Sequence, residues 1–262
     1  MSAPVFLAET SSATPLSSYG EGSVYVLDGS EGRHAGVVQR RGPGERIDVV
    51  DGVGVRLETV VESVVGGSVH LRVLRVVVEP APSVVLTLVQ ALAKGDRDEM
   101  AIEAATELGA NVILPWQAER SVVVWRGDRA AKSRARWVST VRAATKQARR
   151  ACLPTVGDAV TTKQLAVRTA EVVAAGGVVV VLHEEATTPL AEVPLPQAAG
   201  DWGSRELLVV VGPEGGIAEA ELAALTDAGA VAARLGPHVL RTSTAGPVAV
   251  AMLSERLGRW AV

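Results

Sequence analysis

Three loops in the C-terminal part of the chain carry residue types that could bind a ligand or handle a proton. They are residues 183–185, 212–216 and 236–242, with the sequences HEE, GPEGG and GPHVLRT. Each loop follows a short apolar run of the kind that forms a buried strand. In a parallel α/β sheet, loops at the carboxyl ends of neighbouring strands form the ligand-binding edge. The sequence therefore predicts that the three loops build one site.

Two charged residues in these loops are the candidates for chemistry. Glycines allow positive φ angles and a close approach of backbone to a ligand, so Glu214 lies in a loop suited to binding. A carboxylate held there can bind a ligand or move a proton, and the alternative is a surface carboxylate in a turn. Arg241 is the candidate electrostatic partner. Its alternative role is a salt bridge that fixes the loop, including one with Glu214 itself.

Several common sites are excluded by their missing motifs. No G-x-G-x-x-G opens a helix after a strand, and no phosphate-binding G-x-x-x-x-G-K-[ST] is present. No G-x-S-x-G nucleophile elbow supports a hydrolase. The four histidines lack the close spacing of metal ligands, so no metal is expected. A single cysteine, Cys152, excludes an intrachain disulfide.

Composition limits the compartment and the partners. Apolar residues make up 48% of the 262 residues and aromatic residues only 3%, so the core must consist of Val, Leu and Ala. The net charge is -3, and any contact with nucleic acid therefore requires a local basic patch. The N-terminal sequence lacks the pattern of a signal peptide, and no apolar run has the length of a membrane span. A cytoplasmic protein without a membrane partner is expected.

The sequence pattern predicts two domains. Residues 1–78 contain short Val-rich runs between Gly, Pro and Asp turn signals, a pattern typical of a small β-barrel. Glu79-Pro80-Ala81-Pro82 reads as a linker because proline stiffens the chain. Residues 84–262 alternate apolar strands with helical patterns, which predicts an α/β domain with a parallel sheet.

One predicted helix is strongly basic. It runs from Asp128 to Ala151 and holds eight lysines and arginines between Arg129 and Arg150, with no acid among them. Trp137, Val141, Ala144 and Ala148 form its predicted buried stripe. Like charges at four-residue spacing repel, which favours a polyanion such as RNA as a partner, although many basic helices are only solvated. For the smaller cluster near Arg33 and Arg40, the sequence by itself favours a solvated turn.

The motifs together resemble one known family. LHEE (182–185), VGPEGG (211–216), LGPHVLRTST (235–244) and QALAKGDRDEMAIEAATELGA (90–110) are similar to the RsmE family of 16S ribosomal RNA uridine-N3 methyltransferases, within the SPOUT class. The pattern His34…Arg40…Pro43-Gly44-Glu45 resembles the family's N-terminal domain, so the resemblance covers nearly the whole chain. Two positions depart from it. The family often has Glu at the position of Ser243, and Ala-Ala where Gly246-Pro247 stands.

This resemblance implies a fold and an activity. The expected fold is a SPOUT α/β domain with a trefoil knot and a parallel sheet, after a PUA-like, RNA-binding β-barrel. The implied activity is S-adenosylmethionine-dependent methylation of N3 of a uridine in 16S ribosomal RNA of the small subunit, by a homodimer whose active site is shared. The alternatives are a non-catalytic RNA-binding assembly factor and a SPOUT methyltransferase acting on another RNA.

The resemblance also assigns roles to individual residues. Glu214 and Arg241 are the expected catalytic residues. The residues expected to bind the cofactor are Leu182, His183, Gly212, Pro213, Glu214, Gly216, Leu235, Gly236, Val239, Leu240 and Thr242. The residues expected to bind RNA are Arg33, Arg40, Lys94, Arg97, Arg142, Lys146, Arg149 and Arg150.

Overall fold

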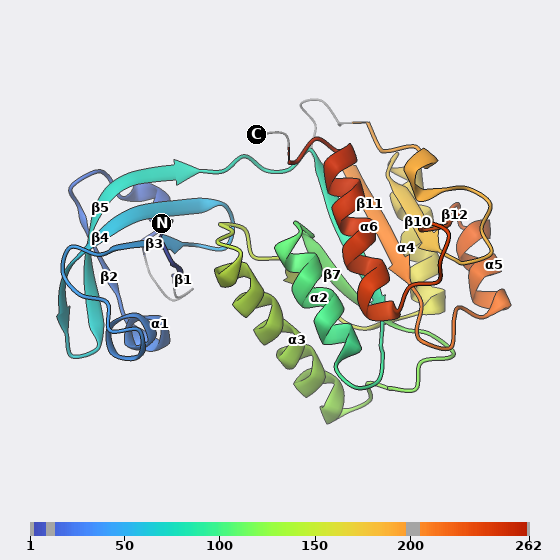
Figure 1. Cartoon of the computed structure of the whole chain (residues 1–262), viewed down its shortest axis with the longest axis horizontal. Helices are drawn as coiled ribbons and strands as arrows, with labels where there is room; N and C mark the ends of the chain where they lie inside the picture. The colour runs from blue at the N-terminus through green and yellow to red at the C-terminus, as the bar shows by residue number, and fades with distance from the viewer. Residues whose placement is uncertain (1–2, 9–13, 198–204, 261–262) are drawn as a thin grey trace. The chain divides into compact units, whose positions relative to one another are not determined.

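The chain folds into two compact units in the computed structural model, which describes residues 3–8, 14–197 and 205–260 (Figure 1). The first unit comprises Met1–Ala81 and Thr145–Leu153, and the second comprises Pro82–Ala144 and Pro154–Val262. The sequence placed the division in the proline-rich linker. It did not indicate that residues 145–153 return to the N-terminal unit.

The first unit is built on a five-stranded sheet in the order β1-β3-β4-β5-β2. Its strands are β1 (Val5–Leu7), β2 (Val24–Leu27), β3 (Arg46–Val50), β4 (Val55–Val65) and β5 (Ser68–Val78). Only β1 and β3 run parallel. Among the described residues the edge strands β1 and β2 do not pair, so the sheet is open. A short helix, α1 (Gly29–Arg33), and a π-helical turn, η2 (His34–Val38), follow β2.

Residues 145–153 are tied to this sheet by backbone and side-chain bonds. The backbone N–H of Leu153 donates to the carbonyl of Gly52 at 2.8 Å, and Arg56 donates to the carbonyl of Arg149 at 2.7 Å. The Lys146 ammonium pairs with the Glu31 carboxylate at 2.8 Å, and both side chains are largely buried. Helix α3 (Asp128–Gln147) therefore begins in one unit and ends in the other. It stops four residues before the predicted end, and its buried stripe is limited to Trp137, Val141 and Ala144.

The second unit is built on a parallel sheet in the order β12-β10-β11-β6-β7-β8. The strands are β6 (Val84–Ala91), β7 (Val112–Gln117), β8 (Thr155–Val156), β10 (Val178–Leu182), β11 (Arg205–Val211) and β12 (Val231–Ala233), and β9 (Val160–Thr161) also pairs with β7. The predicted α/β fold with a parallel sheet is confirmed. β10, β11 and β12 are neighbours, so the three loops that follow them share one edge.

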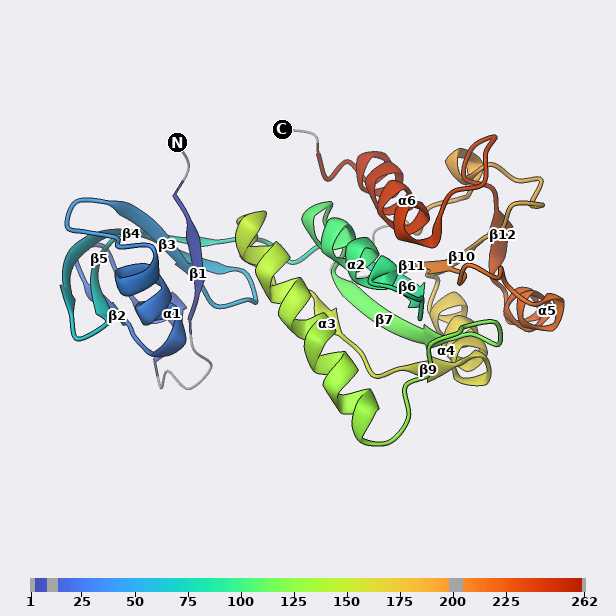
Figure 2. The ribbon, with the colours of Figure 1, turned by 60° about the horizontal axis from the view of Figure 1, so that its bottom comes forward.

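Helices cover both faces of this sheet. Figure 2 shows α2 (Arg97–Glu107) and α6 (Thr242–Arg256) on one face, and α4 (Thr162–Ala174) and α5 (Glu219–Asp227) on the other. Leu165 and Val172 of α4 and Leu225 of α5 join strand valines in a buried cluster. Strands buried on both faces explain the continuous apolar runs of β10 and β11.

Strand β7 continues through Pro115, although a proline usually interrupts or ends a strand. Pro115 is buried within β7. On one side of β7, β8 pairs with Val112 and Ile113, while β9 pairs with Trp116 and Gln117. Pro115 thus lies at the gap between these two short strands, where a missing N–H removes no ladder bond.

Candidate functional site

The three loops meet at the carboxyl edge of the sheet and enclose a pocket of about 450 Å³. This volume lies within the usual range of small-molecule sites. All thirteen loop assignments to cofactor binding or catalysis fall on pocket-lining residues, namely Leu182, His183, Gly212, Pro213, Glu214, Gly216, Leu235, Gly236, Val239, Leu240, Arg241 and Thr242, with Glu214 assigned twice. Strand adjacency thus gathers segments that are separated by up to 60 residues in the chain.

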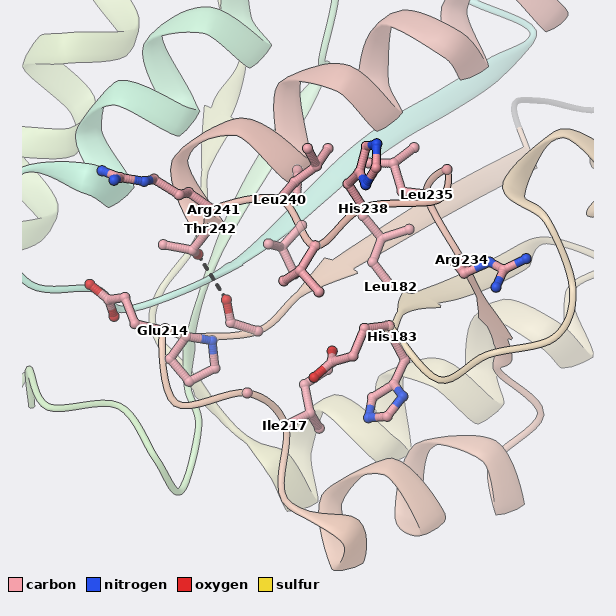
Figure 3. A pocket seen from close by; sticks show the side chains of 18 of the residues that line it. Leu182, His183, Glu214, Ile217, Arg234, Leu235, His238, Leu240, Arg241 and Thr242 are labelled. Atoms are coloured by element: carbon pink, nitrogen blue, oxygen red, sulfur yellow. Dashed lines mark hydrogen bonds between the residues drawn. The ribbon is translucent and has the colours of Figure 1, made fainter.

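The pocket has apolar walls and charged ends. Leu182, Ile217 and Leu240 face one another across its middle (Figure 3). Glu214 and Arg241 lie at one end, and Arg234 lies at the other. Such a cavity suits a ligand with a flat apolar part and charged groups. Arg234, His238 and Ile217 were not predicted, although Arg234 and His238 border or belong to the third loop.

A buried hydrogen-bond relay fixes the floor of the pocket. The amide nitrogen of Gln90, on β6, donates to the Thr242 hydroxyl at 2.9 Å, and that hydroxyl donates to the carbonyl of Gly212 at 2.8 Å. Gln90 is fully buried and Thr242 is 6% exposed. The relay thus joins β6, the first residue of α6 and the loop after β11. Because its hydroxyl is engaged, Thr242 holds the loop in place.

Glu214 is clamped by the loop that follows β6. Its Oε1 accepts from Arg97 Nη1 at 2.7 Å and from the backbone N–H of Lys94 at 3.2 Å. Burial alone would raise the pKa of Glu214, but the hydrogen bonds from Arg97 and from backbone N–H groups outweigh it and lower that pKa. The carboxylate is therefore ionised near neutral pH. The alternative of an Arg241–Glu214 salt bridge is wrong, since Arg97 occupies that position.

Comparison with known proteins relates this chain to RNA methyltransferases. The profile of the RNA methyltransferase domain family matches residues 79–254. A protein of Mycobacterium bovis named ribosomal RNA small subunit methyltransferase E is 51% identical over 91% of this chain and 89% of its own length. Its Bacillus subtilis counterpart is 32% identical over 89% of this chain and 91% of its own length. The chain belongs to the ribosomal RNA small subunit methyltransferase E family.

A solved structure supports this membership. The family member from Neisseria gonorrhoeae, described as bound to S-adenosyl methionine, superposes with a TM-score of 0.80 at 25% identity, covering 97% of this chain and 98% of that one. The resemblance stated from the loop motifs is thereby confirmed.

One departure from the family pattern affects helix α6. Pro247 is the sixth residue of this helix, beyond the first turn where proline is harmless. It removes the bond that a residue at 247 would donate to the carbonyl of Ser243. Gly246 is buried, and a Cβ there would lie 3.0 Å from Leu88 Cδ1 and 3.3 Å from Gln90 Oε1. The departure therefore changes the second turn of the helix.

Three further hydrogen bonds, absent from the sequence prediction, hold the glycine loop and the helix that follows it. Arg120 Nη1 donates to the carbonyl of Gly215 at 3.0 Å. The buried Glu221 carboxylate accepts from the backbone N–H of Glu119 at 2.9 Å and from the Thr162 hydroxyl at 2.5 Å. No sequence pattern links these residues, since 95 and 102 positions separate the first two pairs.

The basic residues of α3 are partly compensated by acids from other elements. Arg134 pairs with Asp158 at 3.1 Å, Arg136 pairs with Glu99, and Lys146 pairs with Glu31 at 2.8 Å. The absence of acids therefore holds within the helix but not around it. Among the residues expected to bind RNA, Arg33, Arg40, Lys94, Arg142 and Arg149 are exposed.

Neither a membrane span nor a metal cluster is found in the described parts of the chain. Within residues 3–8, 14–197 and 205–260, no helix combines the length and apolar character needed to cross a bilayer. The same residues contain no group of three or more His, Cys, Asp or Glu side chains placed to hold a metal ion.

Proposed function

We propose that the protein transfers a methyl group from S-adenosylmethionine to N3 of a uridine in 16S ribosomal RNA of the small subunit. The observation that carries this proposal is the convergence of the three motif loops on one pocket, in a chain that is 51% identical to a named small-subunit methyltransferase. The position of the uridine and the choice of N3 rest on the family resemblance.

The pocket fits the proposed cofactor. Leu182, Leu240 and Ile217 supply apolar walls for an adenine ring, and the backbone of Gly212 and Gly236 can approach a ligand closely. A Cβ at Gly236 would meet no atom within 4 Å, so open space borders this position. The Glu214 carboxylate complements the positive charge of a sulfonium. When bound, S-adenosylmethionine supplies an electrophilic methyl group.

The residues of the chain would hold the pocket loops in place, orient the substrate and stabilise the charge that develops on it. The Gln90–Thr242–Gly212 relay holds the loop after β11 against α6. Uridine N3 becomes nucleophilic only when its proton is lost, which requires a base or groups that stabilise the uracil anion. Because its pKa is lowered, Glu214 is a weak base near neutral pH, so we assign it the orienting role. Arg241 is proposed to contact the RNA beside the pocket.

RNA would be held by the N-terminal domain, residues 1–78, and by the basic surface. We propose that the open five-stranded sheet belongs to a PUA-like barrel. Phosphate contacts are assigned to Arg33, Arg40, Lys94, Arg142, Arg149 and Arg150. Arg97 is not included, because its guanidinium pairs with Glu214 at the pocket. We leave Lys146 out of this set, because its ammonium already pairs with Glu31.

The assembly and topology are also proposals from the resemblance. We propose that residues 84–262 form the methyltransferase domain, that its C-terminal part is threaded as a trefoil knot, and that two chains form a dimer with a shared active site. Cytoplasmic ribosomal subunits or their precursor RNA would be the substrate.

Two measurements test the proposal. Calorimetric titration of the full chain with S-adenosylmethionine should show binding, whereas absence of binding would favour a non-catalytic RNA-binding factor. Mass spectrometric mapping of ribosomal RNA from cells with and without the gene should locate one N3-methyluridine that depends on it. A modification found in another RNA, or at a ribose 2′-hydroxyl, would contradict the assigned substrate.

A further inference from the structure

The guanidinium of Arg97 is held at the charged end of the pocket by an ion pair that the sequence does not suggest. Arg97 lines the pocket, and its Nη1 lies 2.7 Å from Glu214 Oε1 across 117 residues of chain. The side chains are 42% and 28% exposed, so both reach the pocket opening. One oxygen of Glu214 engages one nitrogen of Arg97, and the other guanidinium N–H groups make no bond to a described residue.

The backbone before Arg97 is strained in a way that places this side chain. Gly95 and Asp96 both have left-handed conformations, with φ of 67° and 62°. For a residue with a Cβ such as Asp96 this conformation costs about 1 to 2 kcal/mol. Asp96 gives no side-chain cap to α2, and Arg97 is the first residue of that helix, where a cation opposes the helix dipole. These features destabilise the fold and bring it no benefit, so they point to a role of Arg97 in the pocket.

The proton of a target uracil finds no ready base at this end of the pocket. Glu214 has a lowered pKa and its Oε1 already accepts two hydrogen bonds. Asp98 is buried and bonded to the backbone N–H groups of Ala93 and Glu99, and it is not part of the pocket lining. The residues at this end of the pocket can therefore contribute to catalysis by stabilising the uracil anion, not by removing its proton.

We propose that Arg97 is a catalytic residue that donates hydrogen bonds to a carbonyl oxygen of the target uracil and stabilises its N3 anion; the inference rests on the proposed function. The N3 proton passes to water. The N3 electron pair forms the bond to the methyl carbon, the carbon–sulfur bond breaks, and its electron pair remains on sulfur. Glu214 acts as a positioning residue, because it fixes the guanidinium before the substrate arrives.

Arg97 is better suited to this role than the other arginines of the pocket. Arg234 lies at the opposite end (Figure 3). The side chain of Arg241 extends away from the apolar walls formed by Leu182 and Leu240 (Figure 3). Arg241 also makes no ion pair with a described residue, so nothing in that part of the structure fixes its guanidinium, whereas a preorganised donor is what lowers the cost of developing charge.

The test compares Arg97→Met, Arg97→Lys and the control Arg168→Met in single turnovers at saturating cofactor. Arg168 pairs with Glu206 at 2.6 Å with exposures of 45% and 30%, which closely match the Arg97–Glu214 pair, and it is not part of the pocket lining. Arg97→Met should lower the rate by about 10²-fold or more, as the loss of an oxyanion donor does. Arg97→Lys should lose less, and Arg168→Met should equal the parent.

The pH profile separates a catalytic from a structural role. With the cation removed, the uracil anion forms only at higher pH, so the rate of Arg97→Met should rise with pH over a range where the parent is nearer its plateau. Glu214→Gln should slow the parent but should not slow Arg97→Met further, since both changes remove one interaction. Profiles of equal shape in Arg97→Met and the parent would overturn the inference, as would additive losses.

A binding measurement gives a readout independent of turnover. RNA carrying 5-fluorouridine at the mapped position ionises more readily at N3, so its affinity for the parent should increase with pH, while its affinity for Arg97→Met should not. Equal pH dependence in both proteins contradicts the role of Arg97. Calorimetry should show that Arg97→Met still binds S-adenosylmethionine. If the parent neither binds this cofactor nor methylates uridine, the proposed function is wrong. If the parent methylates uridine and Arg97→Met does so at the same rate, only the role of Arg97 is wrong.

Discussion

At the scale of single residues, the pocket depends on side chains that hold loops. The Thr242 hydroxyl accepts from Gln90 and donates to Gly212 in a buried environment, so it has no donor left for a ligand. The sequence assigned Thr242 to the cofactor because it stands in the third loop. As the first residue of α6, Thr242 lines the pocket, and its hydroxyl joins β6 to the loop after β11.

Thr242→Val should weaken cofactor binding without unfolding the protein. Valine has nearly the same shape but removes one acceptor of the Gln90 amide and the donor to the Gly212 carbonyl, and a buried group that loses its partner costs about 1 to 3 kcal/mol. The Gln90 amide keeps its bond to the Ala91 carbonyl at 3.2 Å. We expect S-adenosylmethionine affinity to fall by roughly tenfold, as a loss of about 1.4 kcal/mol would cause. Calorimetry checks the affinity, and Thr242→Ser, which keeps the hydroxyl, should bind like the parent. Equal affinity of Thr242→Val and Thr242→Ser would show that the relay does not support cofactor binding.

At the scale of elements, helix α6 contains two neighbouring residues that oppose helix formation. Pro247 lies in its second turn and Gly246 lies directly before it, and both residues are poor helix formers. Gly246 has a packing reason, because a Cβ would crowd Leu88. Pro247 is also buried, but the bond to the Ser243 carbonyl that it cannot donate remains a cost that its packing must offset.

Pro247→Ala should therefore stabilise the protein. Alanine restores the bond to the Ser243 carbonyl, and a proline inside a helix costs about 3 kcal/mol, of which the stiffer unfolded chain returns about 0.4 to 1. We expect a gain on the order of 1 to 3 kcal/mol, visible as a higher midpoint of thermal unfolding. The contrasting change, Gly246→Ala, should bring no gain despite the better helix propensity of alanine. An unchanged midpoint for Pro247→Ala would mean that proline packing compensates for the missing bond.

The Lys146–Glu31 ion pair is one of the contacts that tie the C-terminal end of α3 to the first unit, beside the bonds of Arg149 and Leu153. Lys146→Met would leave the Glu31 carboxylate, only 12% exposed, with its weak bond from the Leu7 N–H. We expect a loss of about 1 to 3 kcal/mol in the stability of this unit. Thermal unfolding measures it, and the double variant Lys146→Met with Glu31→Gln should recover part of the loss. Full stability of Lys146→Met would contradict a structural role for the pair.

At the scale of the whole molecule, charge is unevenly distributed. The net charge is -3, yet α3 and the residues after it carry eight lysines and arginines between Arg129 and Arg150. Acids from other elements neutralise three of them, so the surface available to RNA phosphates is smaller than the sequence suggests. Arg142 and Arg149 remain exposed.

RNA affinity should therefore depend on salt through Arg142 and Arg149. Phosphate contacts release counterions, so each lost contact should flatten the log–log salt slope by about 0.7 to 0.9. Arg142→Gln combined with Arg149→Gln should weaken binding of ribosomal RNA and reduce the slope, with cofactor affinity unchanged. Arg168→Gln, at an arginine that pairs with Glu206 and lies outside the proposed RNA-binding set, is the matched control and should leave the slope as it is. An unaltered slope in the double variant would place the RNA path elsewhere, for example near Arg33 and Arg40.

The sequence by itself determined the parallel sheet and the three loops that line the pocket, but it did not indicate Arg234 or Ile217 as lining residues. Apolar runs are local, and the loops that follow neighbouring parallel strands must share an edge, so the sequence alone brings GPEGG and GPHVLRT to one pocket. Only the tertiary structure decided which charges pair. Arg97 with Glu214, Lys146 with Glu31, and Gln90 with Thr242 are separated by 117, 115 and 152 residues. Pairing at such separations depends on how strands are ordered and where the chain returns. No local periodicity records this information, which is why Arg241 was given the partner that belongs to Arg97.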